Sequence, residues 1–207
     1  MSHVVFDEAT HTYTVDGQVL PSVTEICRFL SYDVAVGANT AMRDYAADRG
    51  TRIHEACTLY DFEGEDAEVD TDIVGYVQAY AAFKRDYNVT DWMYYEKPLG
   101  SVELGFAGTP DRIGLIDGKM TIVDLKSGSK INKYALECQL NGYEMLASLL
   151  EIDYSNPLSQ GLNIEQLWGL QLKKDGTYRI IQVPIRLRVF GNCMILHRFL
   201  KGEFDNE

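Results

Sequence analysis

The chain has 207 residues, of which 46% are hydrophobic and 24% are charged, and its formal net charge is −12. These fractions are typical of a globular protein, and the length suits one domain with a buried core. The sequence has no run of 18 or more apolar residues and no basic-then-apolar segment at its N-terminus. We therefore expect a cytoplasmic protein without membrane contact. The acidic balance argues against a broadly basic surface.

The cysteines Cys27, Cys57, Cys138 and Cys193 are widely spaced and form no C-x-x-C pair. Zinc sites and disulfide frameworks use cysteines at characteristic short intervals. We therefore expect neither a zinc site nor a disulfide framework.

The N-terminal part predicts a small extension. A hairpin is expected over residues 4–20, with its turn at Asp16-Gly17. Ser22 and Glu25 have the spacing of a capping box that begins a short helix ending near Leu30. This hairpin-helix extension covers residues 1–37.

The next segment predicts two long helical regions. Apolar residues at near-helical spacing over residues 38–60 predict two helices or one bent helix, interrupted at Gly50. Residues 61–72 are acidic and predict a solvated connection. An amphipathic helix is expected over residues 72–87.

The remainder predicts a sheet. Strands are expected at residues 94–99, in two apolar runs joined by Asp117-Gly118, and at 165–173 and 178–183 around Asp175-Gly176. Helices are expected at about 132–150 and 187–200. The predicted fold is α/β within a single domain, 1–207. A mixed, mostly antiparallel central sheet flanked by helices forms its core, residues 38–207.

Charged residues occur where a core strand does not need them. Thr121 to Val123 are typical of a buried strand, and strand alternation places Asp124 and Lys126 on one face. Buried charges must be paired, hydrated or bound to a metal. Asp111 opens the preceding strand, so the hairpin can bring the two aspartates together. Two oxygen ligands suit Mg²⁺, and a nearby lysine can orient or deprotonate an attacking water.

Pro110-Asp111 followed by Asp124-Leu125-Lys126 resembles the PD-(D/E)xK motif of restriction-endonuclease-like nucleases, and more narrowly the RecB-like and phage-exonuclease branch of that superfamily. Other elements of this branch accompany the motif in the expected order. They are Gly50-x-x-x-His54, residues 105–109, Lys126-Ser127-Gly128 and Gln139-x-x-x-Tyr143. The resemblance covers roughly residues 11–183.

The resemblance implies a restriction-endonuclease-like core and a nuclease that uses one or two Mg²⁺ or Mn²⁺ ions. The metal ligands that it implies are Asp111, Asp124 and the Leu125 carbonyl, with His54 and Glu96 as additional ligands. Relatives with an iron-sulfur cluster carry three clustered downstream cysteines. This sequence lacks that cluster, so no iron-sulfur cluster is expected.

The resemblance also implies that Lys126 positions the nucleophile and that Gln139 and Tyr143 contact the DNA backbone or brace the site. Without the resemblance, His54 is interpreted as a hydrogen-bonded core histidine. Glu96 is equally well explained as an edge-strand residue paired with Lys97 or another surface cation. For Tyr143 and Gln139 the alternatives are a core position and a half-exposed one.

The expected function is a phage or prophage-type exonuclease that acts on DNA ends in recombination or repair. A recombination partner protein, or assembly of several copies into a ring, is compatible with it. Two alternatives stay open: a non-catalytic nuclease-fold module that binds DNA or a protein, and a structure-specific or single-strand nuclease within a larger assembly. The expected phosphate contacts are the basic residues of the last helix, Arg186, Arg188, Arg198 and Lys201, although a solvated helix surface explains these equally well.

Overall fold

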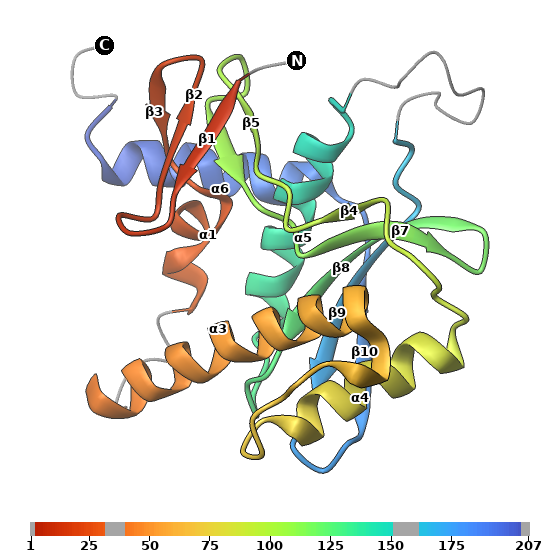
Figure 1. Ribbon diagram of the computed structural model, residues 1–207. Helices are drawn as coiled ribbons and strands as arrows, with labels where there is room; N and C mark the ends of the chain where they lie inside the picture. Colours follow the sequence, from red (N-terminus) through yellow and green to blue (C-terminus); the bar gives the residue numbers. More distant parts are fainter. Residues whose placement is uncertain (1–2, 32–39, 151–161, 204–207) are drawn as a thin grey trace.

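The structure of the chain, a computed structural model, describes residues 3–31, 40–150 and 162–203 (Figure 1). The elements are β1 (Val4–Asp7), β2 (Thr12–Val15), β3 (Gln18–Leu20), α1 (Val23–Ile26), the 3₁₀ helix η1 (Arg28–Ser31), α3 (Thr40–Glu63), the 3₁₀ helix η2 (Gly64–Asp66), α4 (Val74–Asp86), β4 (Tyr94–Tyr95), β5 (Leu99–Ser101), β6 (Phe106–Gly108), β7 (Arg112–Ile116), β8 (Lys119–Lys126), α5 (Lys133–Ala147), β9 (Gln166–Leu172), β10 (Tyr178–Val183) and α6 (Leu187–Leu200).

The central sheet has the strand order β10-β9-β8-β7-β4. β8 and β9 are parallel, while the other neighbouring strands are antiparallel. Helices pack against both faces, α5 on one and α3 with α4 on the other (Figure 1). The mixed α/β architecture expected from the sequence is therefore confirmed.

Strand alternation in β8 divides the core between the two faces. Ile122 belongs to the cluster formed with α5 and α6, whereas Val123 and Leu125 belong to the cluster formed with α3 and α4. Asp124 and Lys126 therefore share the α5 face, as the sequence pattern predicts.

Two tight hairpins have the predicted turns. Asp117 and Gly118 have φ values of 50° and 75°, and Asp16 and Gly17 have 47° and 83°. Positive φ at both central positions matches the twist of the flanking strands and is the reason that Asp-Gly is favoured in such turns. The first of these turns fixes the register of β7 against β8, from Arg112 opposite Val123 onward.

The N-terminal segment forms a three-stranded sheet, β1-β2-β3, rather than one hairpin. The capping interaction is present, because the Ser22 hydroxyl accepts a 3.0 Å hydrogen bond from the Glu25 N–H. Val23 and Ile26 are buried in the cluster around α5. The extension thus contributes directly to the main core.

Of the two alternatives for the segment after the extension, the structure has one helix and not two. α3 is continuous through Gly50, where an interruption was expected, and its predicted start at residue 38 lies outside the described residues. A single glycine costs a helix only about 1 kcal/mol, which packing can offset. The solvated connection expected over 61–72 is wrong at its start, because it begins inside α3 and continues into η2, and the side chain of its first residue, Asp61, is fully buried.

The predicted strand 94–99 is interrupted. Glu96 has a φ of 38°, so the chain leaves the central sheet after β4 and joins β6 through β5 instead. The predicted helices at 132–150 and 187–200 correspond to α5 and α6. Among the described residues, no helix is long and apolar enough to cross a membrane.

Candidate active site

Asp111 lies immediately before β7, at the end of the hairpin opposite its turn. Its side chain is 12% exposed, and Oδ2 accepts a 2.6 Å hydrogen bond from the backbone N–H of Leu125. Arg112 pairs with Val123 in the β7–β8 register. One step further along this register, Asp111 lies opposite Asp124, so the two carboxylates meet where β7 begins and β8 ends.

A chain of polar contacts leads from Asp124 to α5. Lys126 Nζ lies 2.6 Å from Asp124 Oδ2 and donates a 3.1 Å hydrogen bond to Gln139 Oε1. Gln139 Nε2 donates in turn to the Tyr143 hydroxyl, 3.0 Å away. Because Gln139 and Tyr143 are one helical turn apart, they face the strand together and hold the Lys126 ammonium in place.

Asp124 itself is incompletely satisfied. Its side chain is 3% exposed, and Oδ2 has no partner with hydrogen-bond geometry, so its contact with Lys126 is an ion pair only. Buried polar atoms in folded proteins nearly always have a hydrogen-bond partner. An orphaned carboxylate oxygen is therefore a feature to explain by function rather than by stability.

His54 reaches the site from the middle of α3. Its Nε2 lies 3.2 Å from the Leu125 carbonyl oxygen, and its Nδ1 lies 3.5 Å from Asp111 Oδ1. The imidazole therefore stands between two of the three oxygen groups predicted to bind metal. Both interpretations of the sequence apply to it, because it is hydrogen-bonded and also belongs to the site.

Glu96 is placed differently from the other predicted ligands. Its backbone N–H donates to the Asp111 carbonyl at 2.9 Å, but its carboxylate accepts from Thr58 at 3.1 Å and from Arg112 at 3.3 Å. The partner of Glu96 is thus a buried arginine and not a surface cation, while Lys97 Nζ lies over the Tyr94 ring. The structure places Glu96 behind Asp111 as a support.

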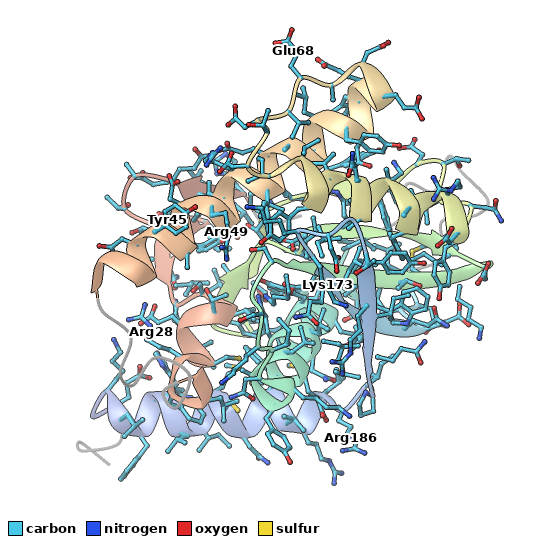
Figure 2. All side chains as sticks on the ribbon, turned by 90° about the horizontal axis from the view of Figure 1, so that it is seen from below. Arg28, Tyr45, Arg49, Glu68, Lys173 and Arg186 are labelled. Carbon is cyan, nitrogen blue, oxygen red and sulfur yellow. The ribbon has the colours of Figure 1, made fainter. Side chains whose placement is uncertain are left out.

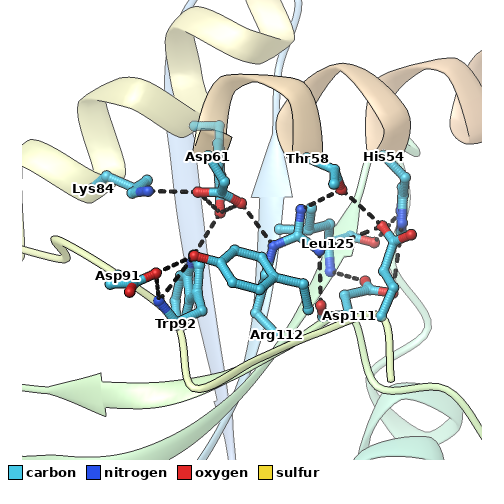
Figure 3. A network of polar contacts seen from close by, with 12 residues as sticks. His54, Thr58, Asp61, Lys84, Asp91, Trp92, Asp111, Arg112 and Leu125 are labelled. Carbon is cyan, nitrogen blue, oxygen red and sulfur yellow. Dashed lines mark hydrogen bonds and ion pairs between the residues drawn. The ribbon is translucent and has the colours of Figure 1, made fainter. Parts of the chain in front are cut away.

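Arg112 is the centre of this supporting layer. Its guanidinium donates to the Asp111 carbonyl and to Thr58, each at 2.7 Å, and to Asp61 Oδ2 at 2.9 Å. Its side chain and that of Asp61 are both fully buried. Asp61 also accepts hydrogen bonds from Tyr80 and from Lys84. These contacts fasten the end of β7 to α3 and α4 (Figure 3).

Sequence reasoning missed Asp61, Thr58 and Arg112, although a signal was present. His54, Thr58 and Asp61 are spaced by four and three residues, which places all three on one face of a helix. That face packs against Arg112 and Leu125. The run of acids after Asp61 hid this periodicity.

Burial and mutual charge shift the pKa values of the four ionisable groups. The Asp111 carboxylate raises the pKa of His54 to about 9, although burial opposes this. Burial raises the pKa of Asp124 to about 6, and Lys126 limits the rise. Burial acts to lower the pKa of Lys126, but the two carboxylates outweigh it and raise that pKa. Burial likewise opposes His54 and Lys126, which lower the pKa of Asp111.

The side chains suit a hard divalent cation only in part. Two carboxylates and the Leu125 carbonyl provide oxygen donors, and His54 adds a nitrogen, a set compatible with Mg²⁺ or Mn²⁺. Within the described ranges, however, no three His, Cys, Asp or Glu side chains are arranged as a ready metal cluster. The orphaned oxygen of Asp124 is the observation that favours a cation.

Cavities near the motif are small or polar. One of about 200 Å³ is lined by Lys126, Gln139 and the start of α5, and another, of about 510 Å³, begins at Ser127. A cavity of about 450 Å³ lies elsewhere, between Lys97 and Leu149, and includes no predicted site residue. The candidate active site thus lies beside the first two of these cavities, where β7 begins and β8 ends.

The four cysteines are buried as free thiols. Although distant in sequence, Cys27 and Cys138 meet in the core, with their sulfur atoms 2.8 Å apart. They lie in the cluster around α5 and take no part in the contacts of the candidate site.

No protein-family model matches the chain, and neither does any curated protein. Among solved structures, one described as "Crystal structure of SSO0001" is 16% identical over 70% of this chain and 74% of that chain, with a TM-score of 0.28. A similarity at that level carries no argument. The functional argument therefore depends on the geometry of the site.

Proposed function

We propose that the protein is a divalent-metal-dependent nuclease that hydrolyses DNA phosphodiester bonds on a restriction-endonuclease-like core. One observation carries the proposal. Two buried carboxylates lie where β7 begins and β8 ends: Asp111 directly precedes β7, and Asp124 lies near the end of β8. The Lys126 ammonium is 2.6 Å from Asp124 Oδ2, an oxygen with this ionic contact but no aligned hydrogen bond. A purely structural ion pair has no need of the second buried acid.

Asp111, Asp124 and the Leu125 carbonyl are the groups that would hold Mg²⁺ or Mn²⁺. When bound, such an ion polarises the phosphoryl oxygens and supplies an activated water. Asp111 is preorganised for this role. The Leu125 N–H fixes its carboxylate, and the Arg112 guanidinium and the Glu96 N–H both donate to its backbone carbonyl.

Lys126 supplies positive charge where a phosphodiester would gain negative charge during hydrolysis. Gln139 holds its ammonium and is itself bound by Tyr143. His54 lies beside Asp111, with Nδ1 3.5 Å from Oδ1, where a neutral imidazole would add a nitrogen ligand. The order of elements from Gly50 to Tyr143 supports the RecB-like and phage-exonuclease branch. We therefore propose DNA ends as the substrate.

The test is digestion of end-labelled linear duplex and covalently closed circular DNA with Mg²⁺, with Mn²⁺ and with a chelator. We expect the wild type to shorten only the linear DNA, and only with metal. Lys126→Ala should lose activity by at least about 100-fold, the scale expected for removing one electrostatic stabiliser of the transition state. The variant should stay folded under the assay conditions, although the buried Asp124 carboxylate loses its ion pair and unfolding becomes easier.

Lys119→Ala is the matched control, because Lys119 begins the same strand at its other end and is exposed. It should digest DNA at the wild-type rate. Equal digestion by Lys126→Ala and wild type would end the proposal. If neither DNA is cut with either metal, the chain is a binding module, whereas cutting of the closed circle would show an endonuclease.

A further inference from the structure

A cavity of about 510 Å³ adjoins the candidate active site where β8 ends. Its charged lining residues are Arg49 of α3, Lys173 and Lys174 after β9, and Arg179 of β10, and the Ser127 to Ser129 loop forms another wall. None of the carboxylates in the described ranges lines it. We call these four cations and this loop the basic cleft. In a chain of net charge −12, such a concentration of one sign is notable.

Strand register connects the basic cleft to the site. Lys126 pairs with Gln171 in the parallel β8–β9 ladder, and Gln171 pairs with Arg179 in the antiparallel β9–β10 ladder. Paired residues on neighbouring strands point to the same face. Lys126, Gln171 and Arg179 therefore form a row across three strands. Two strand spacings, about 10 Å, separate its two cations.

The wall of the basic cleft is held in place. Gln171 is buried, and its amide donates to the Gly128 carbonyl at 2.7 Å and to the Ser129 carbonyl at 3.3 Å. On the α3 side, Gly50 brings the helix close to this loop, because a Cβ atom at that position would lie 3.8 Å from Ser127 Oγ. The loop that follows Lys126 is thus fixed between the sheet and α3.

Among the described residues, no acid pairs with Arg49. Its guanidinium lies 5.9 Å from the ring centroid of Tyr45, which is near it in Figure 2, and 5.8 Å from that of Tyr76. Its Nε is buried and has no hydrogen-bond partner. Stacking on aromatic rings leaves the donors of an arginine free for an anion.

The other three cations also lack ion pairs. Lys173, Lys174 and Arg179 are exposed, and none of them has an acidic group within 4.0 Å among the described residues. Two acids lie in the surroundings: Asp72 is influenced by Lys174, and Asp175 by Lys173. Neither lines the cavity.

The predicted phosphate contacts on α6 differ in this respect. Arg186 pairs with Glu137 at 3.5 Å, Arg198 with Glu203 at 2.8 Å and Lys201 with Glu25 at 3.2 Å. Figure 2 shows Arg186 along α6, apart from Arg49 and Lys173. Acids therefore neutralise most of the α6 cluster, whereas the basic cleft keeps its charge.

We propose that the basic cleft binds phosphates of the nucleic-acid strand whose neighbouring phosphate lies at Lys126. This inference rests on the proposed function, which names nucleic acid as the ligand. Each phosphate step of one strand combines an axial rise of about 3.4 Å with a turn around the helix, so about 10 Å corresponds to only one or two steps. The basic cleft thus explains how an acidic protein holds DNA: a short basic track beside the site replaces a broadly basic surface.

The experiment measures binding of a short fluorescent duplex by anisotropy in EDTA, over a range of salt concentrations. The test variant is Lys173→Gln/Arg179→Gln. The matched control is Lys119→Gln/Arg85→Gln, which removes one exposed lysine and one exposed arginine elsewhere. The test variant should bind about tenfold more weakly or worse. Its plot of log K against log salt should be shallower by up to about 1.8, or about 0.9 for each lost contact. Both variants should melt at the wild-type temperature.

Equal weakening of the two variants would show that only total charge matters and would overturn the inference. So would an unaffected test variant, a wild type that does not bind DNA, or calorimetric titration in which inorganic phosphate binds the basic cleft and DNA does not. Cleavage assays on the same preparations separate this result from the proposed function. If DNA binding depends on the cleft residues but no cleavage occurs in Mg²⁺ or Mn²⁺, the inference about the basic cleft is supported and the proposed nuclease function is contradicted. If the wild type cleaves DNA but the test variant binds as tightly as the wild type, the nuclease function is supported and the inference about the basic cleft is contradicted.

Discussion

The structure has two clusters of buried charged side chains, one containing Arg112 and the other lying beside Asp111. They differ in how many of their charged atoms have hydrogen-bond partners. Asp61 and Arg112 form a closed cluster, in which the Asp61 oxygens accept hydrogen bonds from Arg112, Tyr80 and Lys84. In the open cluster around Asp124, an ion pair with Lys126 leaves Asp124 Oδ2 without a hydrogen bond.

The difference indicates what each cluster does. A buried charge contributes to a stable fold when hydrogen bonds satisfy it on all sides, and it is a liability when they do not. The closed cluster fixes the backbone of Asp111 through its carbonyl. The open cluster lies beside this fixed backbone and contains Asp124, a buried carboxylate that lowers the stability of the fold. Strained sites of this kind commonly lower stability in exchange for activity.

The largest effect should come from the closed cluster. Asp61→Asn leaves the buried Arg112 guanidinium with only the Glu96 carboxylate, 3.3 Å away, as counter-charge and removes the partner of Lys84, so we expect unfolding to become easier by about 3–5 kcal/mol. Urea unfolding followed by tryptophan fluorescence measures this, because Trp92 is buried beside Tyr80 of the same network.

The control is Asp70→Asn, which removes one carboxylate of the surface pair with Arg52. That change should alter the free energy of unfolding by less than about 1 kcal/mol, as is usual for an exposed ion pair. A loss for Asp61→Asn no larger than that of the control would mean that the closed cluster is not a structural support.

The same substitution in the open cluster should have the opposite sign. Asp124→Asn removes a buried carboxylate with an orphaned oxygen, and Lys126 can turn toward water and Gln139. In metal-free buffer we expect a gain of about 1–2 kcal/mol in the free energy of unfolding, the scale of relieving one unsatisfied buried group. DNA cleavage should be lost at the same time. Destabilisation similar to that of Asp61→Asn would erase the distinction between the two clusters.

The open cluster is largely predictable from sequence. Alternation along residues 121–126 places Asp124 and Lys126 on one face, and the Asp117-Gly118 turn fixes the register that brings in Asp111. These are short-range rules, which is why the structure agrees with them. The spacing of Gln139 and Tyr143 on a helix is equally local: Gln139 contacts Lys126, and Tyr143 contacts Gln139.

The closed cluster depends on partners far apart in the chain. Asp61 lies 51 residues before Arg112, and its acidic neighbours suggest a solvated segment until the fold is known. Long-range contacts also explain why α3 continues through Gly50, because its packing outweighs the low helix propensity of glycine. The interruption of the strand at Glu96 follows from its bonds to Thr58 and Arg112, which no local pattern predicts.

A third buried acid, Glu144 of α5, allows a smaller test of the same rule. It is 9% exposed, its Oε2 has no hydrogen-bond partner, and burial raises its pKa above the ordinary value. The folded state therefore binds this proton more tightly than the unfolded state, so Glu144 lowers the free energy of unfolding as the pH rises through the ordinary and then the folded pKa.

Glu144→Gln should stabilise the protein at neutral pH by roughly 0.5–1 kcal/mol. The gain should fade toward pH 4, whereas Glu137→Gln, which breaks the pair with Arg186, should give no gain at either pH. Urea unfolding of both variants at the two pH values measures this, and a gain that persists at low pH would show that charge burial is not its cause.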